Sequence, residues 1–251
     1  MLERIEHGPI LELQLARKPV NALNPALIAL LRQAIEQAPS QGIEGIVLSG
    51  SPGVFSAGLD VPALVKLDRR QMSAFWSDFS ATMRAIACSP VPTVAAITGH
   101  SPAGGAVLAI WCDYRVMAEG EFRIGLNETQ VGLAIPPPII AGLQRLVGPF
   151  RGERLVAEGS MLDAGQALAC GMVDQLVPLA SVTETAVGWL QRHLALPRHA
   201  FTANRTAARR DLVQLFEEPT PRILDDFLDG WFGPQTQTAL QALVAQLQAK
   251  H

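Results

Sequence analysis

A single carboxylate stands in an apolar stretch of the sequence, the segment IGLNETQVG at residues 124–132. Glu128 is the only acidic residue between positions 122 and 151. Burial among apolar neighbours disfavours the charged form of a carboxyl group and so raises its pKa. Such a group suits a reaction in which one side chain first accepts a proton and then returns it. Glu128 is therefore the first candidate for a catalytic residue. The structural alternative is that it caps a loop or pairs with Arg115 or Arg123.

Two glycine-containing loops are the second feature that could do chemistry. They read FSAGLD at residues 55–60 and GHSPAGG at residues 99–105, and each leads toward a predicted helix. Ser101 and Pro102 suit the start of the second helix. The first N–H groups of a helix lack intrahelical partners, and its dipole favours negative charge there. Each loop alone is typical of a tight turn. Together with a base, the two loops could hold the enolate oxygen formed when a proton leaves the carbon next to a carbonyl.

The overall composition excludes several classes of protein. The chain has 251 residues, of which 49% are hydrophobic, enough for one sizeable core. Its net charge of −3 gives no basic footprint for nucleic acid. The cysteines lack CxxC spacing, which favours reduced thiols, and the His and Cys positions predict no metal site. The first residues do not resemble a signal peptide, and no uncharged apolar run reaches the roughly 18 residues that span a bilayer. We therefore expect a cytoplasmic protein with no membrane partner.

Short apolar runs alternate with segments of helical spacing along the chain. Strands are predicted at 10–15, 45–50, 94–97, 113–118, 122–125 and 174–177. Helices are predicted at 26–37, 62–67, 70–87, 106–111, 139–147, 151–158, 163–169, 184–193, 199–216, 222–228 and 235–249. This order predicts an α/β layered fold. The purely helical end predicts two parts, a core at 1–195 and a helical C-terminal subdomain at 196–251.

Three separated motifs resemble the crotonase, or enoyl-CoA hydratase/isomerase, superfamily. They are GVFSAGLD, GHSPAGGAVLAIWCDYRVMAE and FRIGLNETQVGL, in the superfamily's order. KPVNALN and LDAGQALACGMVDQLVP are similar to its flanking segments, so the resemblance covers about residues 8–180. GLNETQVG and PAGG most resemble the branch of Δ3,Δ2-enoyl-CoA isomerases, also called dodecenoyl-CoA isomerases.

The resemblance implies a core of repeated ββα turns wound into a spiral and a homotrimer or a dimer of trimers. It implies acyl-CoA thioester substrates, as in fatty acid β-oxidation, and no cofactor, since CoA is part of the substrate. The backbone N–H groups of Leu59 and Gly104 are expected to form an oxyanion hole, and Glu128 to be the catalytic acid. Substrate contacts are expected at Ser56, Ala57, Gly58, Asp60 and Asn127. Asp60 is also expected to cap the helix that follows it.

The resemblance also suggests which reaction to expect. Many hydratases of the superfamily carry a second glutamate where this chain has Val107. Water addition is helped by two carboxylates, whereas a 1,3-proton shift needs one base and no water. Val107 is expected to keep the site dry. We therefore expect an isomerase that moves the double bond of a 3-enoyl-CoA to the conjugated 2-trans position. The alternatives are an enoyl-CoA hydratase or another acyl-CoA enzyme of the superfamily, and a non-catalytic acyl-CoA-binding member.

The phosphates of CoA require positive charge in a mildly acidic chain. Two basic groups are candidates for this contact: Arg17 with Lys18, and the C-terminal Arg205, Arg209 and Arg210. Arginine and lysine both bind phosphate, but charged runs are more often solvated surface.

Overall fold

The computed structural model describes residues 1–217 and 221–249. Its main sheet has six strands in the order β1-β2-β3-β5-β7-β10. These strands are β1 (Leu2–His7), β2 (Ile10–Leu15), β3 (Gly45–Ser49), β5 (Thr93–Ile97), β7 (Tyr114–Ala118) and β10 (Gln175–Val177). β1 and β2 form an antiparallel hairpin, and every other neighbouring pair is parallel. β3 and β5 are buried along their whole length, which is typical of parallel strands covered on both faces.

A smaller sheet of four strands has the order β4-β6-β8-β9. These strands are β4 (Gly53–Val54), β6 (Gly99–Pro102), β8 (Arg123–Gly125) and β9 (Leu162–Asp163). β4, β6 and β8 follow β3, β5 and β7 directly in the chain, so the core consists of repeated ββα turns, as the resemblance to the crotonase superfamily implies. β4, β6 and β8 run parallel, and their carboxyl ends therefore meet at one edge.

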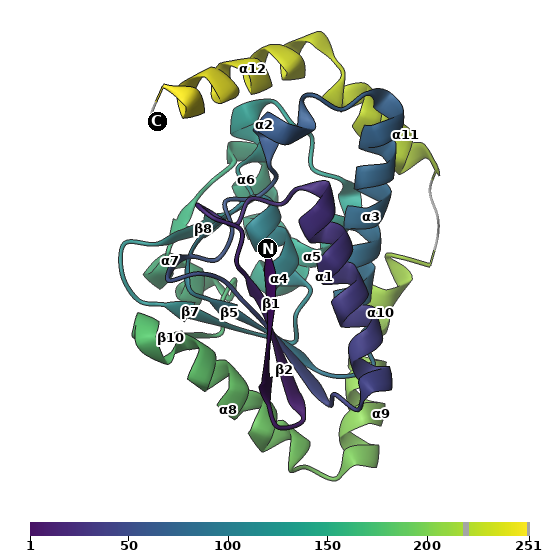
Figure 1. Ribbon diagram of the computed structural model, residues 1–251, viewed down its shortest axis with the longest axis vertical. Helices are drawn as coiled ribbons and strands as arrows, with labels where there is room; N and C mark the ends of the chain where they lie inside the picture. Colours follow the sequence, from purple (N-terminus) through teal and green to yellow (C-terminus); the bar gives the residue numbers. More distant parts are fainter. Residues whose placement is uncertain (218–220, 250–251) are drawn as a thin grey trace.

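Helices cover both faces of the main sheet. They are α1 (Pro25–Gln37), α2 (Val61–Leu64), α3 (Arg69–Ala87), α4 (Gly104–Ile110), α5 (Pro137–Val147), α6 (Pro149–Glu158), α7 (Ala164–Cys170), α8 (Val182–Leu194), α9 (Arg198–Ala208), α10 (Arg210–Gln214), α11 (Pro221–Trp231) and α12 (Pro234–Gln248), with short 3-10 turns η1 (Ala38–Gln41), η2 (Glu128–Val131) and η3 (Leu179–Ser181). α8 packs against one face of the main sheet, and the apolar side chains between them form a cluster separate from the larger core. α1, α3 and α4 lie on the other side (Figure 1). Within the described residues, no helix is both long and apolar enough to cross a bilayer.

Local sequence signals account for several helix starts. Asn24 caps α1 by accepting a hydrogen bond from the Leu27 amide, with Pro25 in the first turn, as predicted. Asp68 and Gln71 form a reciprocal capping box at the start of α3. Each of these caps satisfies amides that the helix itself cannot bond.

The segment at residues 99–102 differs from its prediction as a turn. It forms strand β6, because Gly99 pairs with Gly53 on one side and Ser101 pairs with Ile124 on the other. The prediction that Ser101 and Pro102 start a helix is also wrong. α4 begins at Gly104, and the residue before it, Ala103, makes no side-chain cap. Pairing between distant segments overrides the local helix-start signal here.

The predicted helix at residues 199–216 is broken at Arg209, between α9 and α10. The buried guanidinium of Arg209 donates to the carbonyl oxygen of Trp111 at 2.5 Å and to Asp113 at 3.1 Å. Arg205 donates to the same carboxylate at 2.8 Å. Both arginines are therefore committed inside the protein, and the prediction that they contact CoA phosphates is wrong.

The boundary predicted at residue 195 follows α8, whose buried side belongs to the main sheet. Beyond it, α11 packs against α3 and α12 against α2 and η2. Residues 218–220 and 250–251 of the predicted C-terminal subdomain lie outside the described residues. The division into two parts stays a prediction.

Candidate active site

A cavity of about 620 Å³ opens at the carboxyl edge of β4, β6 and β8. Its lining residues come from five stretches of the chain, within 17–22, 57–62, 102–103, 127–133 and 243–248. The parallel pairing explains this convergence. The first glycine loop follows β4, the end of the second loop (residues 103–105) follows β6, and Glu128 follows β8, so the small sheet brings all three predicted features together.

The backbone amides of Leu59 and Gly104 lie close together at this edge. A Cβ placed on Gly104 would stand 3.3 Å from the nitrogen of Leu59. The backbone of Leu23 bonds to both neighbours of Leu59. Its amide donates to the Gly58 carbonyl oxygen, and its carbonyl oxygen accepts from the Asp60 amide. Among residues 1–217 and 221–249, neither the Leu59 nor the Gly104 amide donates a hydrogen bond. Both amides can therefore donate to an oxygen from outside the protein.

Unusual backbone geometry keeps the two loops in contact. Gly58 has φ of 82°, and a Cβ there would stand 3.0 Å from the carbonyl oxygen of Pro102. Ala103, just before Gly104, has φ of 47° although it is not glycine. For a residue other than glycine such a conformation costs about 1–3 kcal/mol, and such residues cluster at functional sites. Only glycine fits at position 58 without pushing the loops apart.

Glu128 begins η2, lines the cavity and is largely buried. Its Oε2 is buried and has no hydrogen-bond partner within the described residues. Burial raises the pKa of the Glu128 carboxyl to about 7, and a hydrogen bond from its own backbone amide opposes this only in part. Arg115 pairs with Asp174 at 2.6 Å, and Arg123 donates to the Met161 carbonyl oxygen. The alternative that Glu128 pairs with either arginine is therefore wrong.

Four other predicted contact residues lie at or beside the cavity. Ala57, Asp60 and Asn127 line it, and Gly58 lies between Ala57 and the free amide of Leu59. The Oδ1 of Asn127 is buried and has no partner among the described residues. Asp60 caps α2 by accepting from the Ala63 amide, as predicted, and its other oxygen accepts from Arg17. The carboxylate of Asp60 is thus already neutralised.

Two predictions about the cavity wall are wrong. Ser56 is fully buried and does not line the cavity, because its hydroxyl is bonded inside the loop to Asn21 and Gly58. Val107 is also buried, at 1% exposure, because it points into the core from α4. Val107 therefore cannot exclude water from the site by direct contact. The chain nevertheless has no carboxylate at this position, where many hydratases of the superfamily have one.

Helix α12 forms a wall of the cavity that was not predicted from the sequence. Leu243, Leu247 and Gln248 line the cavity, and Figure 1 shows α12 lying across the end of the molecule that carries α2. Thr236 donates to the carbonyl oxygen of Gly132 at 2.7 Å, which ties α12 to the turn after Glu128. The sequence of an amphipathic helix predicts its buried face but not the segment against which it packs. The position of α12 at the cavity is therefore known only from the tertiary structure.

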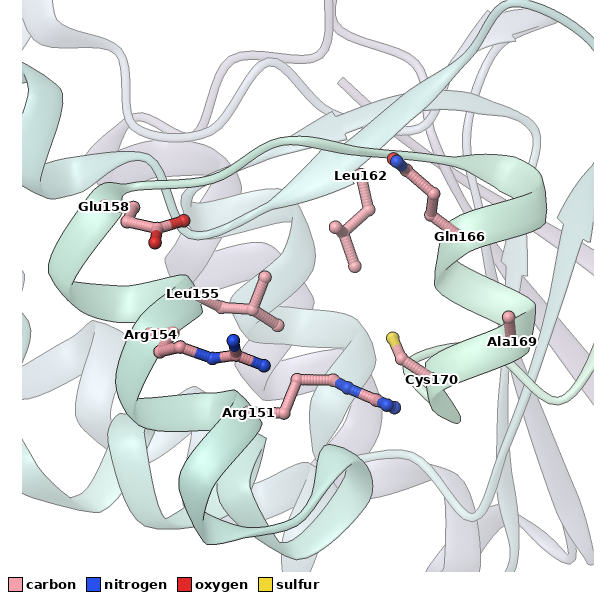
Figure 2. Close-up of a pocket in the computed structure, with 8 residues that line it drawn as sticks. All are labelled: Arg151, Arg154, Leu155, Glu158, Leu162, Gln166, Ala169 and Cys170. Atoms are coloured by element: carbon pink, nitrogen blue, oxygen red, sulfur yellow. The ribbon is translucent and has the colours of Figure 1, made fainter.

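A second hollow of about 350 Å³ lies between α6 and α7. Figure 2 shows Leu155, Leu162 and the Cys170 thiol facing the same space, with the guanidinium of Arg151 beside it. This hollow shares no lining residue with the first one. Since Glu128 and Leu59 line the first cavity and Gly104 lies beside the Leu59 amide, that cavity is the candidate active site. In the described part of the chain, no cluster of three or more His, Cys, Asp or Glu side chains could hold a metal ion.

Comparisons with known proteins find a family model and several relatives that this chain matches. The model of the enoyl-CoA hydratase/isomerase family matches residues 6–220. Human mitochondrial enoyl-CoA delta isomerase 1 is 33% identical over 206 residues, covering 77% of this chain and 68% of the human protein. The probable enoyl-CoA hydratase EchA17 of Mycobacterium tuberculosis is 35% identical over 217 residues, covering 84% and 80%.

The fold itself matches a solved structure almost completely. The crystal structure of human mitochondrial delta3-delta2-enoyl-CoA isomerase superimposes with a TM-score of 0.93 at 27% identity, covering 99% of this chain and 98% of that one. The predicted crotonase-like α/β fold with a helical C-terminal region is thereby confirmed. The family match also spans all three motifs that supply the cavity. This chain belongs to the enoyl-CoA hydratase/isomerase family.

Proposed function

We propose that the protein is an enoyl-CoA isomerase that converts a 3-enoyl-CoA into its conjugated 2-trans isomer. The observation that carries this proposal is the Glu128 carboxyl group, which faces the cavity and has a buried oxygen with no partner among the described residues, together with the two free amides at the same edge of the small sheet. That combination provides a base for a proton beside a carbonyl and donors for the oxygen that becomes negative.

The reaction divides into two proton transfers. Glu128 takes a proton from C2, and the electron pair moves into a dienolate whose charge rests on the thioester oxygen. The Leu59 and Gly104 amides donate to that oxygen, and each such donor typically lowers a barrier by ~3–4 kcal/mol. Glu128 then returns the proton to C4, which leaves the double bond between C2 and C3. A pKa of about 7 suits both halves, because the carboxyl must accept and then donate near neutral pH.

The number of free carboxylates at the cavity favours isomerisation over hydration. Asp60 and Glu128 are the acids that line the cavity, and Asp60 is held by Arg17. One free carboxylate suffices for a proton shift, whereas hydratases of the family often use two. A hydratase that works with Glu128 alone is the second candidate, because a relative named as a probable hydratase is about as similar as the human isomerase.

One pair of assays separates the two candidates. We expect the protein to form the conjugated thioester from 3-hexenoyl-CoA and to form little 3-hydroxybutyryl-CoA from crotonyl-CoA, both measured by chromatography. Faster hydration than isomerisation would reverse the order of the candidates. Tight binding of both esters with no turnover would support a non-catalytic acyl-CoA-binding protein.

The pH dependence follows from the raised pKa of Glu128. Only the ionised carboxylate can take the C2 proton, so kcat/KM for 3-hexenoyl-CoA should rise from pH 5 to pH 8 with a midpoint near the pKa of about 7. Initial rates across this range, corrected for enzyme stability, give the midpoint. A midpoint near 4.5, the ordinary value for glutamate, would contradict the burial of the base.

The wall formed by α12 is expected to limit the length of the acyl chain. Leu243 and Leu247 add apolar surface beside Val131 and Leu133, on the side of the cavity that carries Glu128. Leu243→Trp should lower kcat/KM for dodecenoyl-CoA about 10-fold relative to hexenoyl-CoA, because an overfilled apolar pocket discriminates by size. The exposed Gln246→Trp on the same helix is the matched control. Equal losses for both esters would remove α12 from the acyl pocket.

The remaining expectations belong to the same proposal. Acyl-CoA is the partner, no separate cofactor takes part, and the chain acts in the cytoplasm as a homotrimer or a dimer of trimers. Lys18 at the cavity rim is the candidate contact for a CoA phosphate. Light scattering of the purified protein measures the number of copies.

A further inference from the structure

Asn21, in the motif KPVNALN, has a role that the proposed reaction does not yet use. Its side chain is buried at 1% exposure, and its backbone has φ of 52°. Asparagine tolerates this left-handed conformation better than most residues. Asn21 does not line the cavity, yet its side chain makes four hydrogen bonds. So many bonds at a buried position indicate that it fixes other segments.

The side chain of Asn21 joins the N-terminal segment to the first glycine loop. Its Nδ2 donates to the carbonyl oxygens of Phe55 at 3.1 Å and Val54 at 3.3 Å, and to the hydroxyl of Ser51 at 3.3 Å. Its Oδ1 accepts from the backbone amide of Arg17 at 2.9 Å. The asparagine thus holds the exact place where strand β4 ends and the loop begins.

A second set of bonds runs from the backbone of Asn21 toward the candidate oxyanion site. The Ser56 hydroxyl donates to the Asn21 carbonyl oxygen at 2.8 Å and accepts from the Gly58 amide at 3.1 Å. On either side of Asn21, the Val20 carbonyl accepts from Ala57, and Leu23 bonds to Gly58 and Asp60. Every amide from Ala57 to Asp60 except that of Leu59 is thereby occupied.

We infer that Asn21 and Ser56 are positioning residues that hold the Leu59 amide toward the thioester oxygen. This inference rests on the proposed function and deepens it. If the bonds to Phe55 and Gly58 are lost, the loop keeps its glycine but no longer fixes the direction of the Leu59 N–H. The effect should fall on the transition state, because the N–H meets its strongest partner only when the oxygen becomes negative.

The test uses Asn21→Gly, which keeps the left-handed backbone and removes the side chain. We expect kcat for 3-hexenoyl-CoA to fall about 10- to 100-fold while KM changes less than about 3-fold, since a small misplacement of a catalytic group costs up to about 100-fold. Ser56→Ala removes a single hydroxyl and should lower kcat in the same direction. Asn24→Gly is the matched control, because Asn24 caps α1 and does not contact the loop. It should lower stability and leave kcat unchanged.

A spectroscopic measurement separates positioning from general loss of structure. The infrared stretch of hexanoyl-CoA labelled with ¹³C at the thioester carbonyl should shift to lower frequency on binding, because both amides polarise the carbonyl. The shift should shrink in Asn21→Gly and Ser56→Ala and persist in Asn24→Gly. An unchanged shift and unchanged kcat in Asn21→Gly and Ser56→Ala would overturn the positioning role alone. An unshifted carbonyl in the unaltered protein would overturn the oxyanion site, and the positioning role with it.

Discussion

Glu128→Gln is expected to lower kcat for 3-hexenoyl-CoA by about 10³- to 10⁴-fold, the upper range for the loss of a general acid–base group. Glutamine has nearly the same shape and keeps the cavity wall, but it cannot accept the C2 proton. Among the described residues that line the cavity, no other carboxylate is free to replace it, because Asp60 is bonded to Arg17 and to the start of α2. The measurement is steady-state formation of the conjugated product. Activity near that of the unaltered protein would show that Glu128 is not the base.

The stability of the same variant provides its control. Burial raises the pKa of Glu128 from 4.5 to about 7 in the folded protein. The folded state therefore holds the proton more tightly than the unfolded state, and the stability gained below pH 4.5 is lost as the pH rises through 7. Glutamine stays neutral, so the variant does not lose this stability as the pH rises. The unfolding free energy of Glu128→Gln minus that of the unaltered protein should therefore increase by at most about 3 kcal/mol from pH 4.5 to pH 8. Denaturant unfolding at both pH values measures this increase. A variant that is inactive and also less stable at pH 8 would point to misfolding instead.

Gly104→Ala is expected to lower kcat by about 10²- to 10³-fold, comparable to losing one oxyanion donor. The added methyl group would stand 3.3 Å from the Leu59 nitrogen, 3.4 Å from the Gly58 Cα and 3.0 Å from Leu23 Cδ1. It would therefore crowd the space between the two amides where the thioester oxygen is expected.

A matched glycine in another helix serves as the control for this substitution. Gly165 lies in α7, where an added Cβ would meet only the Asp163 carboxylate, at 3.5 Å. Gly165→Ala should leave kcat unchanged, and circular dichroism should show that both variants keep the fold. Full activity of a folded Gly104→Ala protein would remove this amide from the reaction.

Most longer elements could be predicted from the sequence because their signals are local. The spacing of Met72, Phe75 and Phe79 predicts α3, and all three side chains are buried as expected. Strands β4, β6 and β9 have two to four residues each and carry no pattern of their own. They exist because distant segments pair, as Gly99 does with Gly53. Local reasoning therefore describes the first two turns of this core as strand–loop–helix and misses β4 and β6, whereas it predicts β8.

The candidate site could be predicted in part for the same reason. Glu128 and the two glycine loops stand out as motifs, and the parallel order of β4, β6 and β8 explains why they meet. The wall from α12 depends on how the last helix folds back, and nothing local signals it. The bonds from Asn21 to Phe55 and Ser56 also lie beyond sequence reasoning, because they join residues more than 30 positions apart.

The central claim is that one carboxyl group carries the proton from C2 to C4. The most direct measurement uses 3-hexenoyl-CoA with deuterium at both C2 positions, turned over in ordinary water and sampled early in the reaction. Nuclear magnetic resonance of the 2-trans product locates the label. If Glu128 carries the proton, a measurable share of the deuterium lost from C2 should appear at C4. Hydrogen at C4 drawn entirely from the solvent would contradict that claim.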